Sequence, residues 1–323
     1  MKHRPRILVI GSVNTDMTVR VGRLPRPGET ILGDAFVSSS GGKGANQAVA
    51  ASRAGGDVTF ICCVGPDTFG RQTLAGLKRE GIRVRWVRGH SEAPTGVALI
   101  FVSRDGENCI AVAPGANALL SVDAVAKHEA EFSRCDLLLM QLETPLKTAV
   151  AAAKLAARFG VPVVLNPAPA PVGFPAGLLL PLVTVITPNA NEAGALTGIP
   201  VRNKTHARRA ALWFHERGVP NVAITLGKAG VFLSCENGHE WIPAHQVRMI
   251  DTVGAGDVFN GALAVGLAGG QTLSGAVEFA AAAAAISVTR YGAQASSPLR
   301  EEILKLARIV KGSTLSMRRP QPG

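Results

Sequence analysis

The sequence predicts an α/β fold: a doubly wound, mostly parallel sheet flanked by helices, with a small β-sheet lid. Short apolar runs alternate with helical segments of about ten residues or more, which is typical of a parallel sheet covered on both faces. Aromatic residues make up only 5% of the chain, and the abundant small and branched apolar residues suit close packing of helices on strands. Two further stretches read as strands without a helix between them, and they predict the lid.

The predicted elements follow in a regular order. Two β-branched runs at 7–13 and 58–64 predict strands, and a helix at 44–54 is expected between them, ended by Gly55 and Gly56. A second helix is expected at 68–80, before Gly81. Thr144 and Pro145 are expected as the N-cap and first residue of an amphipathic helix that ends at 159. Further strands are expected at 136–140, 161–165, 183–186 and 222–226, and a last buried helix follows the DTVGAGD stretch.

The lid is expected from residues 15–37 and 95–113, the second with a turn at 104–107. Two hairpin-like pieces so far apart could pair into a second sheet, and a lid protects a reactive phosphoryl group from water. The alternative is an antiparallel extension of the main sheet. Exposed lid edges would suit a homodimer. We expect one domain over 1–312 and a disordered tail over 313–323.

Composition excludes several classes of protein. The net charge is +11, but Lys and Arg are spread along the chain, and a single Tyr leaves little for base stacking. We therefore expect no nucleic-acid partner, and a basic surface that attracts anionic nucleotides. Five cysteines without CxxC spacing argue against a disulfide framework or a zinc site. The apolar runs are shorter than the ~20 residues of a membrane span, so we expect a cytoplasmic protein without membrane partners.

The stretch DTVGAGD, from Asp251 to Asp257, is the most informative one. A small-residue loop that opens a helix presents backbone N–H groups, to which an anion can come close. Asp257 stands at the same place, and a phosphoryl-transfer site needs a group that accepts a proton from the attacking hydroxyl. The alternative is an N-cap aspartate on an ordinary glycine-rich turn.

A second group of polar residues includes side chains that follow the predicted strands at 7–13 and 136–140. Asn14 and Asp16 come directly after the first strand, where ligands of open α/β sheets bind. The GGKGAN turn opens a helix but lacks the Walker spacing. Its N–H groups, Lys43 and Asn46 could converge with Asn14 and Asp16 on a sugar, since each hydroxyl both donates and accepts. Glu143 could join them, or it could be an acid in the first turn of a helix.

These segments resemble the signatures of the ribokinase-like carbohydrate kinase family. GGKGANQAVAASRAG resembles the N-terminal signature and DTVGAGDVFNGALA the C-terminal one. GSVNTD, LLMQLE, TPNANE and TLGKAG stand in the family's order, and the likeness covers about residues 7–309. The resemblance implies a ribokinase-like fold and an ATP-dependent sugar kinase. The implied reaction converts D-ribose and ATP to D-ribose 5-phosphate and ADP at the 5-hydroxyl.

The resemblance also implies roles for individual residues. Asp257 would be the general base, and Gly254, Ala255 and Gly256 would form the backbone anion hole for the phosphoryl group. The sugar would be held by Asn14, Asp16, Gly42, Lys43, Asn46, Glu143 and Asp257. The nucleotide would be bound by Asn189, Thr225, Leu226, Gly227, Lys228, Ala229, Gly230 and Gly256.

Two metal ions are implied as well. Glu192 would help to place Mg²⁺ through water. A K⁺ activator would lie beside the anion hole, at Asp251, the carbonyls of Val253, Ser287, Arg290 and Gly292, and Ser296. The family often has Thr where this chain has Val253, and Ala281 stands where a relative can carry a polar residue near the adenine.

Three alternatives stay open. A kinase of the same family could act on deoxyribose, fructose or a nucleoside, although Asn14 and Asp16 together favour ribose. A catalytically silent sugar-binding regulator is the second alternative, against which the intact Asp257 and GAG turn argue. A dinucleotide-dependent oxidoreductase is the third. It is disfavoured because GSVNTD, not GxGxxG, follows the first strand.

Overall fold

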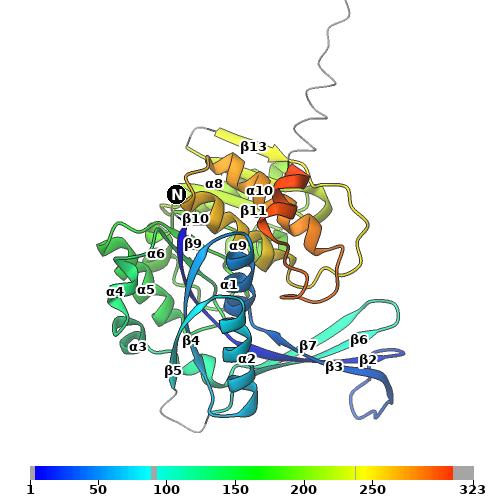
Figure 1. The fold of residues 1–323 in the computed structure, drawn as a ribbon. Helices are drawn as coiled ribbons and strands as arrows, with labels where there is room; N and C mark the ends of the chain where they lie inside the picture. Colours follow the sequence, from blue (N-terminus) through cyan, green and yellow to red (C-terminus); the bar gives the residue numbers. More distant parts are fainter. Residues whose placement is uncertain (1–3, 89–92, 237, 308–323) are drawn as a thin grey trace, which may run out of the picture.

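The computed structural model describes residues 4–88, 93–236 and 238–307. Its centre is a nine-stranded sheet, from which a separate four-stranded sheet projects (Figure 1). In chain order the strands of the main sheet are β1 (Arg6–Ile10), β4 (Asp57–Val64), β5 (Arg83–Arg88), β8 (Leu137–Met140), β9 (Val163–Leu165), β10 (Val185–Ile186), β11 (Asn221–Thr225), β12 (Val231–Cys235) and β13 (Gly238–Ile242).

The main sheet is parallel except at one edge. Its order is β13-β12-β11-β10-β9-β8-β1-β4-β5, and only β12 and β13 run antiparallel to their neighbours. This confirms the predicted fold class. The strand predicted at 7–13 is shorter than expected, because β1 ends at Ile10 and a new strand begins at Asn14. The expected strand at 183–186 has only two residues, and the β12–β13 hairpin and β5 were not predicted.

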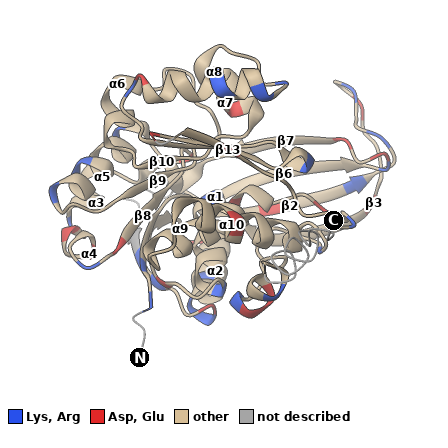
Figure 2. Cartoon of the chain, turned by 90° about the horizontal axis from the view of Figure 1, so that it is seen from above, with Lys and Arg blue, Asp and Glu red and all other residues tan. Residues whose placement is uncertain are grey.

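Helices cover both faces of the main sheet. In β1, Ile7 and Val9 pack in one hydrophobic cluster and Leu8 and Ile10 in the other, because successive side chains of a strand point to opposite faces. Figure 2 shows the two helical layers with the sheet between them, and Lys and Arg distributed over both layers and the projecting sheet.

One layer contains α1 (Lys43–Arg53), α2 (Thr68–Arg79), α9 (Ala255–Ala268) and α10 (Leu273–Ser287). The other contains α3 (Val122–Ala126), α4 (Glu129–Phe132), α5 (Leu146–Arg158), α6 (Ala176–Leu179), α7 (Ala190–Thr197) and α8 (Lys204–His215). Short 3₁₀ turns lie at η1 (Gly115–Leu119), η2 (Leu180–Leu182) and η3 (Gly227–Ala229).

The start of α5 differs from the prediction. Pro145 precedes the helix with ψ 131°, and no side chain caps this end. The helix therefore begins at Leu146, not at Pro145, and Thr144 is not its N-cap. The helices expected at 44–54 and 68–80 are α1 and α2, each within a residue or so of the expected bounds.

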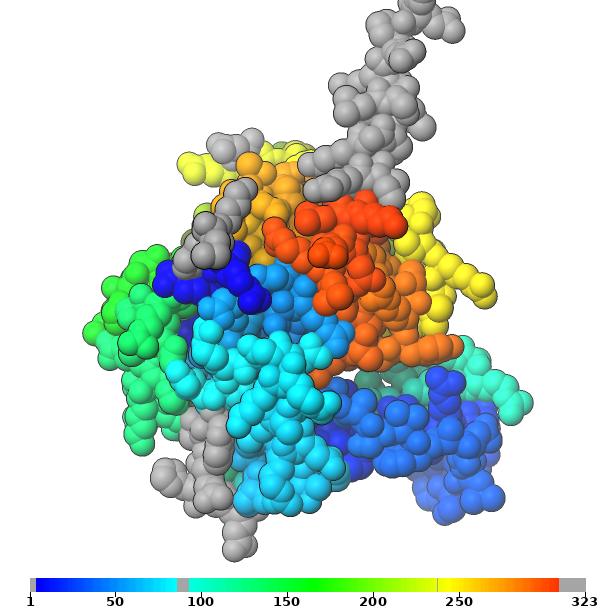
Figure 3. Space-filling view, viewed as in Figure 1, coloured from blue at the N-terminus to red at the C-terminus, as the bar shows by residue number. Residues whose placement is uncertain are grey.

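The four-stranded sheet is the predicted lid. Its strands are β2 (Asn14–Val21), β3 (Gly33–Gly41), β6 (Gly96–Ser103) and β7 (Asn108–Ala113), in the order β3-β2-β6-β7. It is separate from the main sheet, so the alternative of an edge extension was wrong. Figure 3 shows the lid, in blue and teal, extending beneath the orange and yellow C-terminal part.

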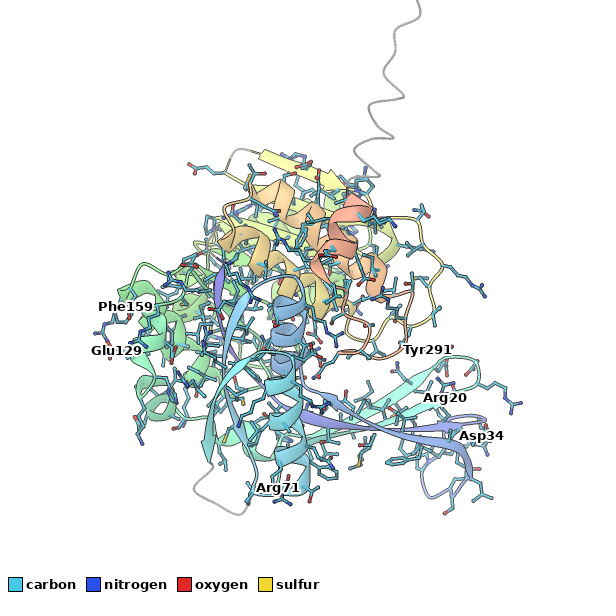
Figure 4. The ribbon with its side chains drawn as sticks, in the orientation of Figure 1. Arg20, Asp34, Arg71, Glu129, Phe159 and Tyr291 are labelled. Carbon is cyan, nitrogen blue, oxygen red and sulfur yellow. The ribbon has the colours of Figure 1, made fainter. Side chains whose placement is uncertain are left out.

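The lid also contacts the main body through the outer half of β2. The guanidinium of Arg20 on β2 lies over the ring of Tyr291 at 6.0 Å from the centroid (Figure 4).

None of the helices within the described ranges has the length and hydropathy needed to cross a membrane. The tail expected at 313–323 lies outside the described residues.

Candidate active site

The candidate site lies where the direction of winding changes in the main sheet. β1 lies between β4 and β8, and all three run parallel. The crevice at the carboxyl ends of strands on either side of such a point is where open α/β sheets bind ligands. Here β1 leads directly into the lid strand β2, and α1 starts at the end of β3, so the lid and the main sheet meet at this crevice.

The first turn of α9 forms one wall of the site. Its N-cap is Gly254, with φ +75°, and a Cβ there would lie 2.8 Å from Cα of Ala293. Only glycine fits this position without strain. The 14-residue helix that follows presents its positive end to the crevice. The predicted anion-hole residues Gly254, Ala255 and Gly256 therefore lie together at a helix N-terminus.

Asp257 is the third residue of α9 and its side chain is buried. Nδ2 of Asn46 donates to Oδ2 of Asp257, and Nε2 of Gln47 donates to Oδ1, both over 3.0 Å. The carboxylate is thus held by side chains of α1 and does not cap α9, so the N-cap alternative was wrong. Burial raises the pKa of Asp257, while Lys43 and the two amides oppose that rise.

Glu143 and Lys43 bring the N-terminus of α1 into the same site. Oε2 of Glu143 accepts hydrogen bonds from Oγ of Ser12 at 2.5 Å and from the backbone N–H of Lys43 at 3.0 Å. Glu143 precedes α5, so the alternative of a first-turn acid was wrong. Burial lowers the pKa of Lys43, but the carboxylates of Asp257, Glu143 and others nearby outweigh it and raise this pKa.

Asn14 and Asp16 extend the site onto the lid. Burial raises the pKa of Asp16 to about 6, and the charges of Glu143 and Asp257 add to the rise. Oδ1 of Asn14 accepts from Nδ2 of Asn117 at 2.8 Å, which fixes the orientation of its amide.

Gly42 lets the chain pass closely beneath these lid residues. It has φ +86°, and a Cβ there would lie 2.7 Å from the backbone nitrogen of Asn14. The structure thus brings together all the residues predicted to hold the sugar.

Two adjoining cavities lie beside this cluster. The smaller, about 170 Å³, is lined by the first turn of α9, Lys43, Asn189, Glu192 and Thr225, among others. The larger, about 540 Å³, shares Asn189 and Thr225 and continues along Leu226, Gly227 and Ala229 to Trp241. Lys228 and Gly230 belong to the same turn without lining either cavity.

Asn189 and Glu192 also have a structural role. Oδ1 of Asn189 accepts from the backbone N–H of Glu192, and the Glu192 carboxylate accepts from the N–H of Asn189, which is a capping box on α7. Burial raises the pKa of Glu192. The carboxylate still lines the smaller cavity, so capping the helix leaves it within reach of a ligand there.

The residues expected around a monovalent cation come from two adjacent segments. Oδ2 of Asp251 accepts from the N–H of Gly292 at 2.9 Å, and Oδ1 accepts from the N–H of Val253 at 3.0 Å. Ser287 and Ser296 are both buried. The turn before α9 is therefore tied to the segment after α10.

In the described part of the chain, no group of three or more His, Cys, Asp or Glu could hold a metal.

Sequence reasoning missed several polar residues of the site. Asn166 directly follows β9 and Thr187 directly follows β10, and both line the smaller cavity together with Asn260 of α9. The available signal was a polar residue immediately after a buried strand. Gln47 and Gln141, which are buried beneath the site, gave a weaker signal because a polar residue in a short apolar segment is common.

Comparisons with known proteins agree with this geometry. Residues 4–300 match the family model described as pfkB family carbohydrate kinase. The ribokinase of Haemophilus influenzae is 44% identical over 302 residues, which cover 94% of this chain and 98% of that protein. The deoxyribokinase of Salmonella typhi is 35% identical, over 92% of this chain and 96% of its own length.

Solved structures show the same fold. The ribokinase of Thermotoga maritima superposes with a TM-score of 0.85 at 37% identity, over 95% of this chain and 100% of that one. The ribokinase of Arabidopsis thaliana, complexed with ribose and ATP, superposes with a TM-score of 0.83 at 31% identity, over 95% and 99% of the two chains.

Proposed function

The chain belongs to the pfkB family of carbohydrate kinases, and on that basis we propose that it phosphorylates D-ribose. ATP is the phosphoryl donor, and the products are D-ribose 5-phosphate and ADP. The observation that carries the proposal is the buried carboxylate of Asp257 in the first turn of α9, directly beside the small-residue turn that begins at Gly254. A base and a backbone anion site in contact are what transfer of a phosphoryl group to a hydroxyl requires.

The proposed proton acceptor is Asp257. Its carboxylate would take the proton of the 5-hydroxyl as that oxygen attacks the γ-phosphorus of ATP, while the bond from phosphorus to the leaving oxygen of ADP breaks. The N–H groups at the start of α9 and the ammonium of Lys43 would stabilise the negative charge on the transferring group. Positioning and charge stabilisation would supply most of the rate, and the base about 10²–10⁴-fold.

Sugar binding is proposed for the residues around the lid hinge. Oδ1 of Asn46 is buried and has no hydrogen-bond partner among the described residues. A hydroxyl of the sugar would satisfy it, which is a strong reason to place the sugar there. The carboxylates of Asp16 and Glu143 would accept further hydrogen bonds from sugar hydroxyls, and the N–H of Gly42 and the ammonium of Lys43 would donate. Five of the proposed nucleotide residues line the larger cavity: Asn189, Thr225, Leu226, Gly227 and Ala229.

Mg²⁺ and K⁺ are proposed as the metal ions of the reaction. A single carboxylate at the edge of a phosphate site fits Mg²⁺, which usually keeps several waters. Glu192 would help to place it through water, and Mg²⁺ would neutralise phosphate charge. The K⁺ ion would lie between the segments that Asp251 and Gly292 join. The family resemblance implies that its other oxygen ligands would come from Val253, Ser287, Arg290 and Ser296. There K⁺ would supply positive charge beside the anion hole.

A sugar panel tests the function. Purified protein with MgATP and K⁺ is assayed for ADP release with ribose, deoxyribose, fructose and nucleosides. The highest kcat/KM is expected with ribose. A preference for deoxyribose would favour the alternative of a deoxyribose kinase, which is consistent with the similarity to the deoxyribokinase of Salmonella typhi. ADP release with none of these substrates, despite measurable ribose binding, would instead indicate a sugar-binding regulator.

A further inference from the structure

Five buried polar side chains form a continuous network beneath the site. They are Gln47 of α1, Gln141 after β8, Asn166 after β9, Thr187 after β10 and Asn260 of α9. Each is less than 7% exposed. Burying so many amide and hydroxyl groups is costly unless they find partners. Among the described residues, all the buried side-chain oxygen and nitrogen atoms of the network find one except Oε1 of Gln141.

One end of the network holds the carboxylate of Asp257. Nε2 of Gln47 donates to Oδ1 of Asp257 at 3.0 Å and to Oδ1 of Asn166 at 3.1 Å. Nε2 of Gln141 donates to Oε1 of Gln47 at 2.6 Å. Because its oxygen faces a donor and its nitrogen faces two acceptors, the Gln47 amide has one favourable orientation.

The other end of the network holds the backbone of the first turn of α9. Nδ2 of Asn166 donates to the carbonyl of Thr187 at 3.1 Å, and Oγ1 of Thr187 donates to Oδ1 of Asn260 at 2.5 Å. Nδ2 of Asn260 then donates to the carbonyl of Gly256 at 2.8 Å. This bond fixes the peptide between Gly256 and Asp257.

We propose that this network is a positioning device for phosphoryl transfer, in which Gln47 orients the carboxylate of Asp257 and Thr187, acting through Asn260, holds Gly256. The inference rests on the proposed function, since it assumes that Asp257 is the base and Gly256 part of the anion hole. The network ties both to the ends of three neighbouring strands, so they keep one geometry relative to each other. Misplacing a reacting group by an ångström can cost about a hundredfold in rate.

The Gln47 end has a signature in the pH profile. The hydrogen bond from Gln47 lowers the pKa of Asp257, against the rise caused by burial. The charged groups that interact with Asp257 are Lys43, Glu143, Asp16 and Glu192, and all of them remain when Gln47 is replaced. Loss of the donor therefore raises the pKa of Asp257 further.

The first experiment compares wild type with Gln47→Met, which keeps the volume and removes the amide. We expect the acid limb of kcat, measured at saturating ribose, to move to higher pH, and kcat at its optimum to fall about tenfold to a hundredfold, with ribose KM nearly unchanged. An acid limb at the wild-type pH would overturn the role of Gln47, even if the variant were less stable, because lost stability alone does not move a catalytic pKa.

The second experiment tests the Thr187 end with matched variants. Thr187→Val removes the hydroxyl that donates to Asn260 and keeps the shape. Thr148→Val removes a hydroxyl of another buried threonine, which donates to the carbonyl of Leu120 at 2.6 Å, outside the network. We expect Thr187→Val to lower kcat about tenfold without moving the acid limb, and Thr187→Ser to restore it. Thr148→Val should lower Tm to a similar extent and leave kcat unchanged.

Equal kcat values for Thr187→Val and Thr148→Val would overturn the positioning role of Thr187. The wild-type assay separates this inference from the proposed function. If wild type phosphorylates ribose and both network variants behave as their controls, only the network proposal fails. If wild type phosphorylates no sugar, the proposed function fails and the network proposal with it.

Discussion

The side-chain amide of Asn46 donates to Oδ2 of Asp257 over 3.0 Å, joining residues 211 positions apart in the chain. The hydrogen bond connects the glycine-rich turn at the start of α1 with the first turn of α9. It places a proposed sugar-binding side chain in contact with the proposed base. The hydroxyl to be phosphorylated is therefore expected to bind at this contact, within reach of both groups.

Asp257→Asn should lower kcat by about 10²–10⁴, because the amide cannot accept the hydroxyl proton. Ribose affinity, measured by calorimetry, should change little, since the other residues around the sugar remain. The amide nitrogen of the new asparagine would face the N–H donor of Asn46 or Gln47, which destabilises the fold. The variant also removes a buried charge, which stabilises it, so Tm should stay within a few degrees. Turnover like that of wild type would disprove the assignment of the base.

Two glycine variants separate folding from catalysis in the turn before α9. A Cβ on Gly254, at φ +75°, would lie 2.8 Å from backbone of Ala293, whereas one on Gly256 would meet no atom within 4 Å. Gly254→Ala should lower both Tm and kcat, with a cost of about 1–2 kcal/mol in stability from the left-handed backbone alone.

Gly256→Ala is the matched variant. It should keep the wild-type Tm and still lower kcat, because its methyl group would project into the open space beside the proposed anion hole. Thermal denaturation and steady-state kinetics on both variants check the pair. If Gly256→Ala kept full activity, the phosphoryl group could not lie against this turn.

Asp16 makes sugar binding and stability depend on pH in opposite ways. Its pKa in the folded protein is about 6, above its ordinary value of 3.8. As the pH falls through about 6, Asp16 becomes protonated and accepts fewer hydrogen bonds from the sugar hydroxyls, so ribose KM should rise. In the folded state Asp16 binds its proton more readily than in the unfolded state. Its ionisation therefore destabilises the fold increasingly as the pH rises from about 4 to 6, and the full effect remains above that range.

Asp16→Asn tests both consequences. At pH 8 it should raise Tm and also raise ribose KM, and the gain in Tm should shrink as the pH falls toward 4. The KM of the variant should lose its dependence on pH near 6. A KM that still rises there with the same slope would assign the titration to another group, such as Glu192, whose pKa is also raised by burial.

The sequence predicted the parts of this site that are continuous in the chain. The turn from Gly254 to Asp257 could be interpreted from its own residues, because a helix N-terminus and a carboxylate follow from local order. Gln47 could not, since on α1 it looks like any buried-face residue, and its partner Asp257 lies 210 positions away. The burial of Asp257 could not be predicted either, because the side chains that surround it come from distant parts of the chain.

Strand ends were predicted less well than strand positions. The apolar run 7–13 continues past β1 because Val13 is buried in the same hydrophobic cluster as Ile7 and Val9, although the ladder to β4 stops at Ile10. Hydropathy reports burial, whereas a strand ends where its hydrogen-bonded partner ends. The β12–β13 hairpin was missed because β12 follows β11 after only a short 3₁₀ turn, without the helical crossover expected between parallel strands, and β13 lies at the sheet edge.

Potassium should activate the enzyme. In an assay with MgATP and tetramethylammonium as the only other monovalent cation, KCl is expected to raise kcat on the order of tenfold, equivalent to ~1.4 kcal/mol in the barrier. Asp251→Asn should blunt this response, because it removes the formal negative charge beside the proposed ion. Asp34→Asn, on the exposed lid strand β3, is the control and should respond like wild type. Identical rates with and without KCl would exclude activation by K⁺.

The lid should mediate formation of a homodimer. On β2, Met17 and Val19 point to the face opposite Asp16, and their ladder partners on that face include Phe36 and Leu99. Phe36 is 64% exposed and Leu99 49% exposed, which leaves an apolar surface on a sheet with two open edges.

Leu99→Arg should convert a dimer of wild-type protein to a monomer, as measured by light scattering after size exclusion. A charged side chain in the centre of an apolar interface is costly to bury, whereas it is harmless on a free surface. The control is Leu178→Arg, which places the same charge at an apolar position of α6 that is 62% exposed and distant from the lid in sequence. The control should keep the wild-type mass. A wild-type protein that is monomeric at high concentration, or two variants with equal mass, would show that the exposed lid face does not hold subunits together.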